Sequence, residues 1–153
     1  MNSPDVPWSP TVSPETFLAM GREVLARQAF SVLIGAELQA LSPGRCELHV
    51  PVSDSIRQQH GFVHGGVVSY AADNALTYAG GTAMRVPVVT SEFKINYVRP
   101  AVGERLIARA HAVHHGKSQA VCRCDVFVLK DGVEKLCAVA QGTIAALPQA
   151  TTE

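Results

Sequence analysis

One stretch of twenty residues, Gly65 to Met84, constrains the fold of this chain more than any other feature. Its sequence, GGVVSYAADNALTYAGGTAM, is apolar or small at nearly every position, with Asp73 and Asn74 at the centre. A helix that is apolar on every side is wrapped by other structure, and small residues let neighbouring backbones approach it closely. A carboxylate in the middle of a membrane span is costly. We therefore predict a buried helix over residues 64–84 and no membrane span.

The segments on both sides of this helix alternate apolar and polar residues with a period of two, which is typical of half-buried strands. Before the helix, two such segments flank the turn Ser42-Pro43-Gly44-Arg45 and predict a β-hairpin over residues 36–52. After it, we expect strands over residues 88–99, 105–113, 118–129 and 135–147, with Lys130-Asp131-Gly132 as a tight turn. Strands joined by hairpins form an antiparallel sheet, so the predicted class is α+β.

The N-terminal region is predicted to contribute an arm and one short helix. Prolines at positions 4, 7 and 10 indicate a loose or extended arm over residues 1–13. Ser13 followed by Pro14 is typical of a helix N-cap and first position, and apolar residues at helical spacing continue to about Gln28. No repeat or second domain follows, so residues 14–153 are expected to form a single domain.

The charge balance limits the class of partner. Lys+Arg and Asp+Glu each number 13, so the net charge is zero, whereas a protein that binds duplex nucleic acid would carry a basic excess. Charged residues make up only 17% of the chain, which suggests that another subunit covers part of the surface. The first ten residues show neither the basic nor the apolar segment of a secretory signal, so a cytoplasmic location is expected.

The cysteines and histidines do not indicate a metal site. The four cysteines fit no zinc-binding spacing, and the histidines form no ligand pattern with the carboxylates. We interpret the cysteines as small buried thiols that stay reduced, and we expect neither a metal nor a separate cofactor.

The informative motif stands at the start of the long helix. A helix start leaves backbone N–H groups without partners and carries partial positive charge. The N–H of Gly65, in the triplet His64-Gly65-Gly66, is therefore suited to hold a carbonyl oxygen that becomes an oxyanion. Nine residues after His64, Asp73 would be costly on an apolar helix unless it is used or paired. Taken separately, these residues could also be a plain helix start, a satisfied histidine and a structural carboxylate.

The spacing of this motif predicts a dimer if the motif is catalytic. At ~1.5 Å per residue, the eight steps from Gly65 to Asp73 span roughly 12 Å. At ~100° per residue, His64 and Asp73 face opposite sides of the helix. The two groups can act on one atom only if a second copy brings its Asp73 to the first copy's Gly65. A two-fold axis relating antiparallel helices would create two equal sites.

The chain resembles the PaaI-type acyl-CoA thioesterases of the hotdog-fold superfamily. The resemblance covers about residues 30–147 and rests on Gly61-x-x-His64-Gly65-Gly66 with Asp73, on the run Asn96 to Ala101, and on the Gly116 turn. It implies a hotdog fold, in which a curved antiparallel sheet wraps around one long central helix. It also implies assembly into dimers and usually tetramers.

The resemblance further implies a role for each site residue. Asp73 would be the general base or nucleophile, and the Gly65 N–H beside His64 would polarise the thioester carbonyl from the opposite subunit. Gln58 stands where many members have asparagine. A hydroxyl on the following strand often assists, and strand alternation lets only one of Thr90 and Ser91 face the site.

Further positions are candidates for substrate binding. We expect the acyl pocket between the long helix and the partner chain, with the nucleotide end of coenzyme A running toward Arg99 and Lys117. The candidate pocket residues, at and after the start of the helix, are Phe62, Val63, Gly66, Val67, Tyr70 and Tyr78.

These features lead to one function and three alternatives. We expect hydrolysis of an acyl-CoA thioester, with an aryl or short-to-medium acyl group, to the free acid and coenzyme A, which is part of the substrate. The alternatives are an acyl-CoA sensor without catalysis on the same fold, a hotdog hydratase, and a structural assembly module. A hydratase normally carries its Asp and His a few residues apart, and a structural module would leave the cost of Asp73 unexplained.

Overall fold

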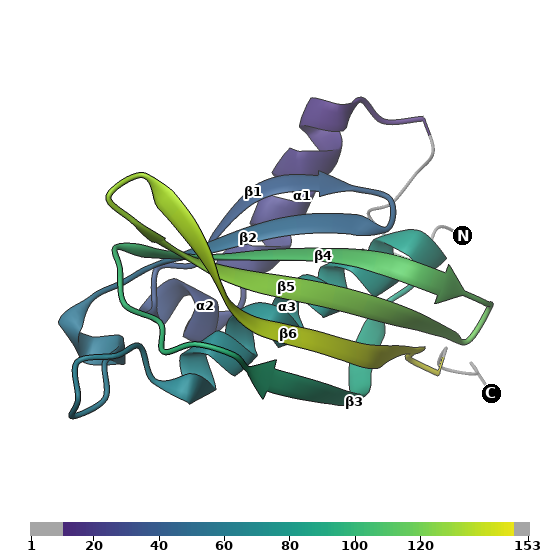
Figure 1. The fold of residues 1–153 in the computed structure, drawn as a ribbon. Helices are drawn as coiled ribbons and strands as arrows, with labels where there is room; N and C mark the ends of the chain where they lie inside the picture. The colour runs from purple at the N-terminus through teal and green to yellow at the C-terminus, as the bar shows by residue number, and fades with distance from the viewer. Residues whose placement is uncertain (1–10, 149–153) are drawn as a thin grey trace.

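A computed structural model describes residues 11–148 of the chain, which form one antiparallel sheet wrapped around a long helix (Figure 1). In chain order, the elements are α1 (Pro14–Ala26), α2 (Ala29–Leu33), β1 (Glu37–Ser42), β2 (Arg45–Pro51), the 3-10 turn η1 (Asp54–Ile56), α3 (Gly65–Met84), β3 (Val88–Tyr97), β4 (Arg105–His115), β5 (Gln119–Lys130) and β6 (Val133–Ala146). The predicted α+β class and the hotdog fold are confirmed.

The described residues include only the end of the predicted arm. Of residues 1–13, positions 1–10 lie outside the described range, and the side chain of Val12 packs partly buried against the core. Ser13 caps α1 as expected, because its hydroxyl accepts a hydrogen bond from the Thr16 N–H at 3.2 Å. Within residues 11–148, no helix is both long and apolar enough to cross a membrane.

The six strands follow the order β1-β2-β4-β5-β6-β3, and every neighbouring pair is antiparallel. The predicted tight turn joins β5 to β6, and both Asp131 (φ 51°) and Gly132 (φ 76°) have the positive φ that such hairpin turns require. The sequence pattern does not show that β3 lies beside β6 rather than β4. This crossover makes β1 and β3 the two edge strands.

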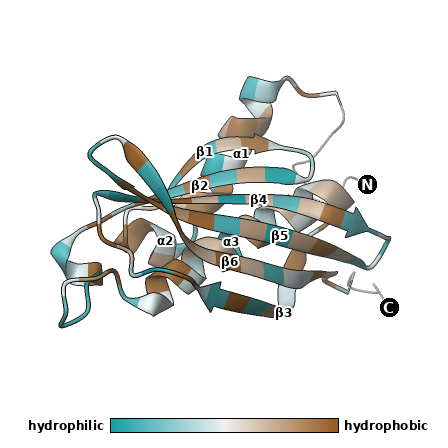
Figure 2. Ribbon diagram, in the orientation of Figure 1, coloured by the Kyte–Doolittle hydropathy of each residue, from teal (hydrophilic) through white to brown (hydrophobic). Residues whose placement is uncertain are grey.

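The core lies between α3 and the concave face of the sheet. Polar and apolar residues interleave along the strands (Figure 2), and alternate positions point toward α3. The sheet-facing side of α3 carries several small residues that are fully buried, such as Ala72, Ala75 and Ala79. At Gly80, an added Cβ would stand 2.7 Å from the Cβ of Ile144 in β6. The small residues of α3 therefore set how closely the sheet approaches the helix.

This close approach predicts a stability effect at Gly80. The variant Gly80→Val places three carbons where Ile144 already packs, and overpacking of a core costs ~1–3 kcal/mol or more. We expect a fall of about 2–3 kcal/mol in the free energy of unfolding, measured by urea denaturation.

The matched control for this prediction is Gly116→Val, because the nearest atom to its added Cβ lies 3.9 Å away. It should change the free energy of unfolding by no more than about 0.5 kcal/mol. Equal stability of the two variants would contradict the packing at Gly80.

All four cysteines are buried in the core, and burial raises the pKa of each thiol, to about 11 for Cys122 and Cys137. Since only the thiolate reacts, the folded protein should not react with a thiol reagent at pH 8. Unfolding in guanidinium chloride should make all 4 thiols accessible to the reagent. Rapid labelling of any cysteine in the native protein would show that the core is open at that point.

Candidate functional site

The first turn of α3 is organised by its own capping residue. Nδ1 of His64, the N-cap, accepts a hydrogen bond from the Gly66 N–H at 2.9 Å. This contact occupies the Gly66 N–H, whereas the N–H of Gly65 has no hydrogen-bond acceptor within residues 11–148. Partial positive charge from the helix gathers at this amide. The structure therefore shows His64 as a capping residue that leaves Gly65 as the available donor.

Tyr97 of β3 holds the same turn from the other side. Its hydroxyl donates to the Gly65 carbonyl at 3.0 Å and is also hydrogen-bonded to the Ser69 hydroxyl. In the sequence, Tyr97 stands out only as part of the run Asn96 to Ala101 that carries the family resemblance. No local pattern could have shown this contact, because Ser69 and Tyr97 are 28 residues apart and belong to different elements.

A cavity of about 330 Å³ opens beside Gly65. Five of the predicted site residues line it together: Gln58, Phe62, Val63, Gly65 and Arg99. The side chain of Gln58 accepts a hydrogen bond from the His60 N–H, and the guanidinium of Arg99 donates to the Leu136 carbonyl at 2.9 Å. Both side chains are thus held at the wall of the cavity.

Asp73 lies two turns further along α3, half-buried at the edge that faces β3. Its Oδ1 accepts a hydrogen bond from the Thr90 hydroxyl at 2.6 Å. The Thr90 hydroxyl also lies 3.0 Å from that of Thr77, which donates to the Asp73 carbonyl at 2.8 Å. Within residues 11–148, no cation lies within 4.0 Å of the Asp73 carboxylate, and Oδ2 has no hydrogen-bond partner.

A β-bulge decides which hydroxyl of β3 faces Asp73. The register of β3 against β6 shifts between Thr90 and Glu92, so that Ser91 is the extra residue. Thr90 stands opposite the buried Ile144 and points to α3, whereas Ser91 is exposed. The structure therefore places Thr90 at the Asp73 carboxylate and Ser91 away from it.

The residues expected to form one acyl pocket are divided in this chain. Tyr78 lines a second cavity of about 280 Å³, between α1, α3 and the start of β3. Tyr70 lines neither cavity, because its hydroxyl is hydrogen-bonded to Ser31 and to Asn74, and burial raises the pKa of its phenol. Gly66 and the buried Val67 line neither cavity either. Within one chain, these residues therefore do not line one cavity, and the expected pocket between α3 and the partner chain stays a prediction.

The expected cations of the nucleotide path are also separated. Arg99 follows the end of β3, near the cavity beside Gly65. Lys117 is exposed in the β4–β5 turn, which lies at the opposite end of the sheet (Figure 1). Within the described residues, no group of three or more His, Cys, Asp or Glu side chains is placed to hold a metal ion.

Known proteins are similar to this chain in sequence and in fold. Acyl-coenzyme A thioesterase 13 from Homo sapiens is 30% identical over 103 residues, which are 66% of this chain and 74% of that protein. The 1,4-dihydroxy-2-naphthoyl-CoA hydrolase of Listeria monocytogenes is 26% identical over 114 residues, or 73% of this chain and 90% of that protein.

A solved structure is similar as well. A mutant of the phenylacetic acid degradation protein PaaI from Thermus thermophilus superposes with a TM-score of 0.68 and 31% identity, over 77% of this chain and 98% of that one. The sequence model of the thioesterase superfamily matches residues 60–135. The chain therefore belongs to the thioesterase superfamily, as its resemblance to PaaI-type hotdog proteins predicts.

Proposed function

We propose that this protein hydrolyses an acyl-CoA thioester, with an aryl or short-to-medium acyl group, to the free acid and coenzyme A. The observation that carries the proposal is the Asp73 carboxylate, which is half-buried, unpaired with any cation of the described residues, and anchored through one oxygen by Thr90. Membership of the superfamily supports the reaction class, and the two named relatives act on CoA thioesters.

The anchored carboxylate fits the role of base or nucleophile. Thr90 fixes Oδ1, so Oδ2 is left to take a proton from water or to attack the thioester carbonyl carbon. Attack turns the carbonyl oxygen into an oxyanion, which a backbone N–H at a helix start can stabilise. Collapse of this tetrahedral species breaks the C–S bond and releases the coenzyme A thiolate. If water is the nucleophile, the product is the free acid. If Oδ2 is the nucleophile, a mixed anhydride with Asp73 remains, and water then hydrolyses it to the free acid and the Asp73 carboxylate. In this proposal, the Gly65 N–H supplies the oxyanion contact.

The contacts within one chain support a site shared between two copies. Gly65 belongs to the cavity with Gln58 and Phe62, whereas Asp73 contacts Thr90 and Thr77, and none of these residues joins both groups. The rise of a helix separates the two positions by roughly 12 Å. Gly65 of one copy would therefore act with Asp73 of the other.

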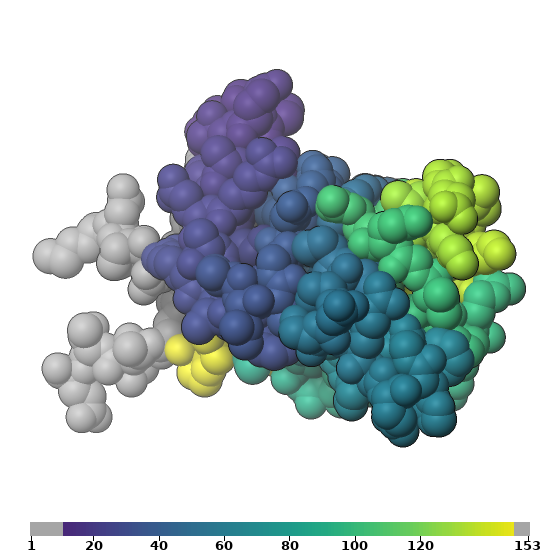
Figure 3. All heavy atoms as spheres, turned by 90° about the vertical axis from the view of Figure 1, so that its left-hand side faces the viewer, coloured from purple at the N-terminus to yellow at the C-terminus, as the bar shows by residue number. Residues whose placement is uncertain are grey.

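The surface around β3 supports the same assembly. β3 is an edge strand, and an exposed edge offers unpaired backbone groups to another strand. Val89 on β3 and Val98 just beyond it are at least half exposed, as is Phe30 of α2, which contacts Tyr70 of α3. Figure 3 shows α2 and the loop before α3 on the surface at one end of the molecule. We propose a homodimer about this edge, with pairing of dimers into a homotetramer as the resemblance implies.

One prediction separates the two hydroxyls of β3. Thr90→Val keeps the side-chain volume and removes a hydrogen bond to a carboxylate, an interaction worth ~1.5–3 kcal/mol. We expect kcat for acyl-CoA hydrolysis to fall about 10-fold to 100-fold, measured by release of free thiol. Ser91→Ala is the control and should keep normal turnover. The assignment is overturned if Ser91→Ala is the more damaging change.

A second prediction tests the shared site with two inactive variants. Asp73→Asn removes the base or nucleophile, and Gly65→Pro removes the proposed N–H donor. Proline is favoured at the first position of a helix, and His64 (φ −58°, ψ 133°) has the backbone conformation that a following proline requires. Gly65→Ala is the matched control: it keeps the N–H, and its Cβ would make only ordinary contact with Tyr97, at 3.5 Å.

Mixing the two inactive variants with subunit exchange should recover about a quarter of wild-type turnover, since half of the dimers carry one intact site. No recovery from exchanging, folded subunits would exclude a site shared between copies. If the protein binds acyl-CoA but shows no hydrolysis that depends on Asp73, the result would instead support an acyl-CoA sensor without catalysis.

A further inference from the structure

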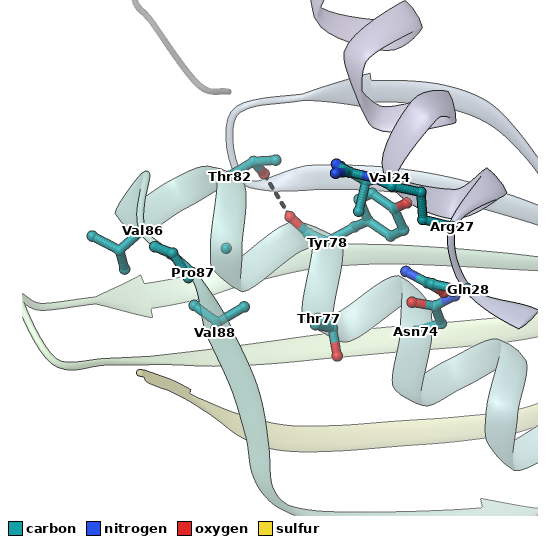
Figure 4. A pocket seen from close by; sticks show the side chains of 11 residues that line it. Val24, Arg27, Gln28, Asn74, Thr77, Tyr78, Thr82, Val86, Pro87 and Val88 are labelled. Atoms are coloured by element: carbon teal, nitrogen blue, oxygen red, sulfur yellow. Dashed lines mark hydrogen bonds between the residues drawn. The ribbon is translucent and has the colours of Figure 1, made fainter. Parts of the chain in front are cut away.

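We propose that the second cavity, between α1, α3 and the start of β3, receives the acyl group, and that Arg27 selects acyl groups ending in a carboxylate. This inference rests on the proposed thioester hydrolysis and names the class of its substrate: the half-thioester of a dicarboxylic acid, aliphatic or aromatic. The cavity and its residues are drawn in Figure 4.

The cavity lies next to the proposed reactive carboxylate. Thr77 lines it, and the hydroxyl of Thr77 is 3.0 Å from that of Thr90, which donates to the Asp73 carboxylate. Asn74, the residue after Asp73, lines it as well. A thioester whose carbonyl carbon sits at Asp73 can therefore extend its acyl group directly into this cavity.

Size and walls of the cavity fit an acyl group. Its volume of about 280 Å³ is near the lower end of small-molecule sites, too small for a whole acyl-CoA. Val24 of α1 and Val86 and Val88 before and on β3 make its walls apolar. Figure 4 shows the residues of the α3–β3 connection on one side and Arg27 and Gln28 on the other, with Thr77 and Tyr78 of α3 between them.

Two of the polar side chains on the wall, Asn74 and Gln28, are held in a hydrogen-bond network. The amide of Asn74 donates to Gln28 Oε1 at 2.9 Å and to the Tyr70 hydroxyl at 3.0 Å. Gln28 Oε1 also accepts from the Ser31 hydroxyl at 2.7 Å. This network fixes the wall, and Arg27 is the charged residue among those that line the cavity.

Arg27 differs in this respect from two arginines of the sheet, Arg105 and Arg109. Arg105 pairs with Glu37 at 2.8 Å, and Arg109 pairs with Glu47 and Glu134 at 2.8 and 2.6 Å. In the part of the chain that the structure describes, no carboxylate or other hydrogen-bond acceptor engages the guanidinium of Arg27. A guanidinium beside an apolar cavity matches a carboxylate at the end of an apolar chain, through two parallel hydrogen bonds.

The test compares hexanoyl-CoA with adipoyl-CoA, which differ only in a terminal methyl or carboxylate. We expect Arg27→Met to lower the ratio of kcat/KM for adipoyl-CoA over hexanoyl-CoA about tenfold, because a charge-assisted hydrogen bond is lost at an exposed guanidinium. Arg27→Glu should lower the ratio further and favour 6-aminohexanoyl-CoA over hexanoyl-CoA. Arg22→Met is the control, since it removes the same charge from α1 outside this cavity and should leave the ratio unchanged.

The same comparison is made by equilibrium binding of the two non-hydrolysable thioether analogues. If Asp73-dependent hydrolysis occurs but Arg27→Met leaves the ratio unchanged, the proposed function stands and the role of Arg27 is overturned. If neither thioester is hydrolysed but binding of the adipoyl thioether depends on Arg27, the recognition of the carboxylate by Arg27 stands and the proposed hydrolysis is overturned. An equal loss for both acyl groups, with a lower melting temperature, would show that Arg27 only stabilises the end of α1.

Discussion

The close contact between the small residues of α3 and the concave face of the sheet is the constraint on which the rest of the structure depends. Gly80 has no room for a side chain because Ile144 of β6 fills the space, and Ile144 stands opposite Thr90 in the register of β6 with β3. Helix, β6 and β3 are thus fixed to one another at one point. The hydrogen bond between Thr90 and Asp73 needs this fixed spacing, since a shift of about 1 Å would lengthen it beyond useful geometry.

The positions of the polar residues of α3 also fit this close packing against the sheet. The side of the helix toward the sheet is apolar, apart from the buried Thr82, which bonds to the β1–β2 turn. The other polar residues of its centre lie on a stripe that is only partly covered. On that stripe, Asp73 and Thr77 bond to Thr90, and Asn74 bonds to Gln28 and Tyr70. Within residues 11–148, no buried side-chain oxygen or nitrogen lacks a hydrogen-bond partner. The half-exposed position of Asp73 is therefore compatible with a stable core and leaves one carboxylate oxygen at the surface.

The sequence predicts the local elements well and the contacts between them poorly. The helix over residues 64–84 and the strand boundaries follow from hydrophobic periodicity and turn residues, which act within a few positions. The place of β3 beside β6, the bonds of Tyr97 to α3 and the role of Arg27 at a cavity depend on residues far apart in the chain. The acyl pocket is expected between the long helix and the partner chain, and one of its candidate residues, Tyr70, is held in a network with Ser31 that no local pattern shows. Helix α2, five residues long, is also not predicted, because so short an element has no periodicity of its own.

The bulge at Ser91 has a consequence for how strands of this family are compared. In a regular strand, positions 90 and 92 would point to the same face of the sheet, but here Thr90 points to the helix while Glu92 is exposed and bonds to Thr143. Side chains before Ser91 and side chains after it therefore both alternate between the two faces of the sheet, but the two alternations are offset by one residue. An alignment that keeps strand length but moves this residue by one position assigns the inward hydroxyl to the wrong place. Residues of β3 in different relatives are consequently equivalent when they lie at the same distance from the bulge, and not when they have the same number along the strand.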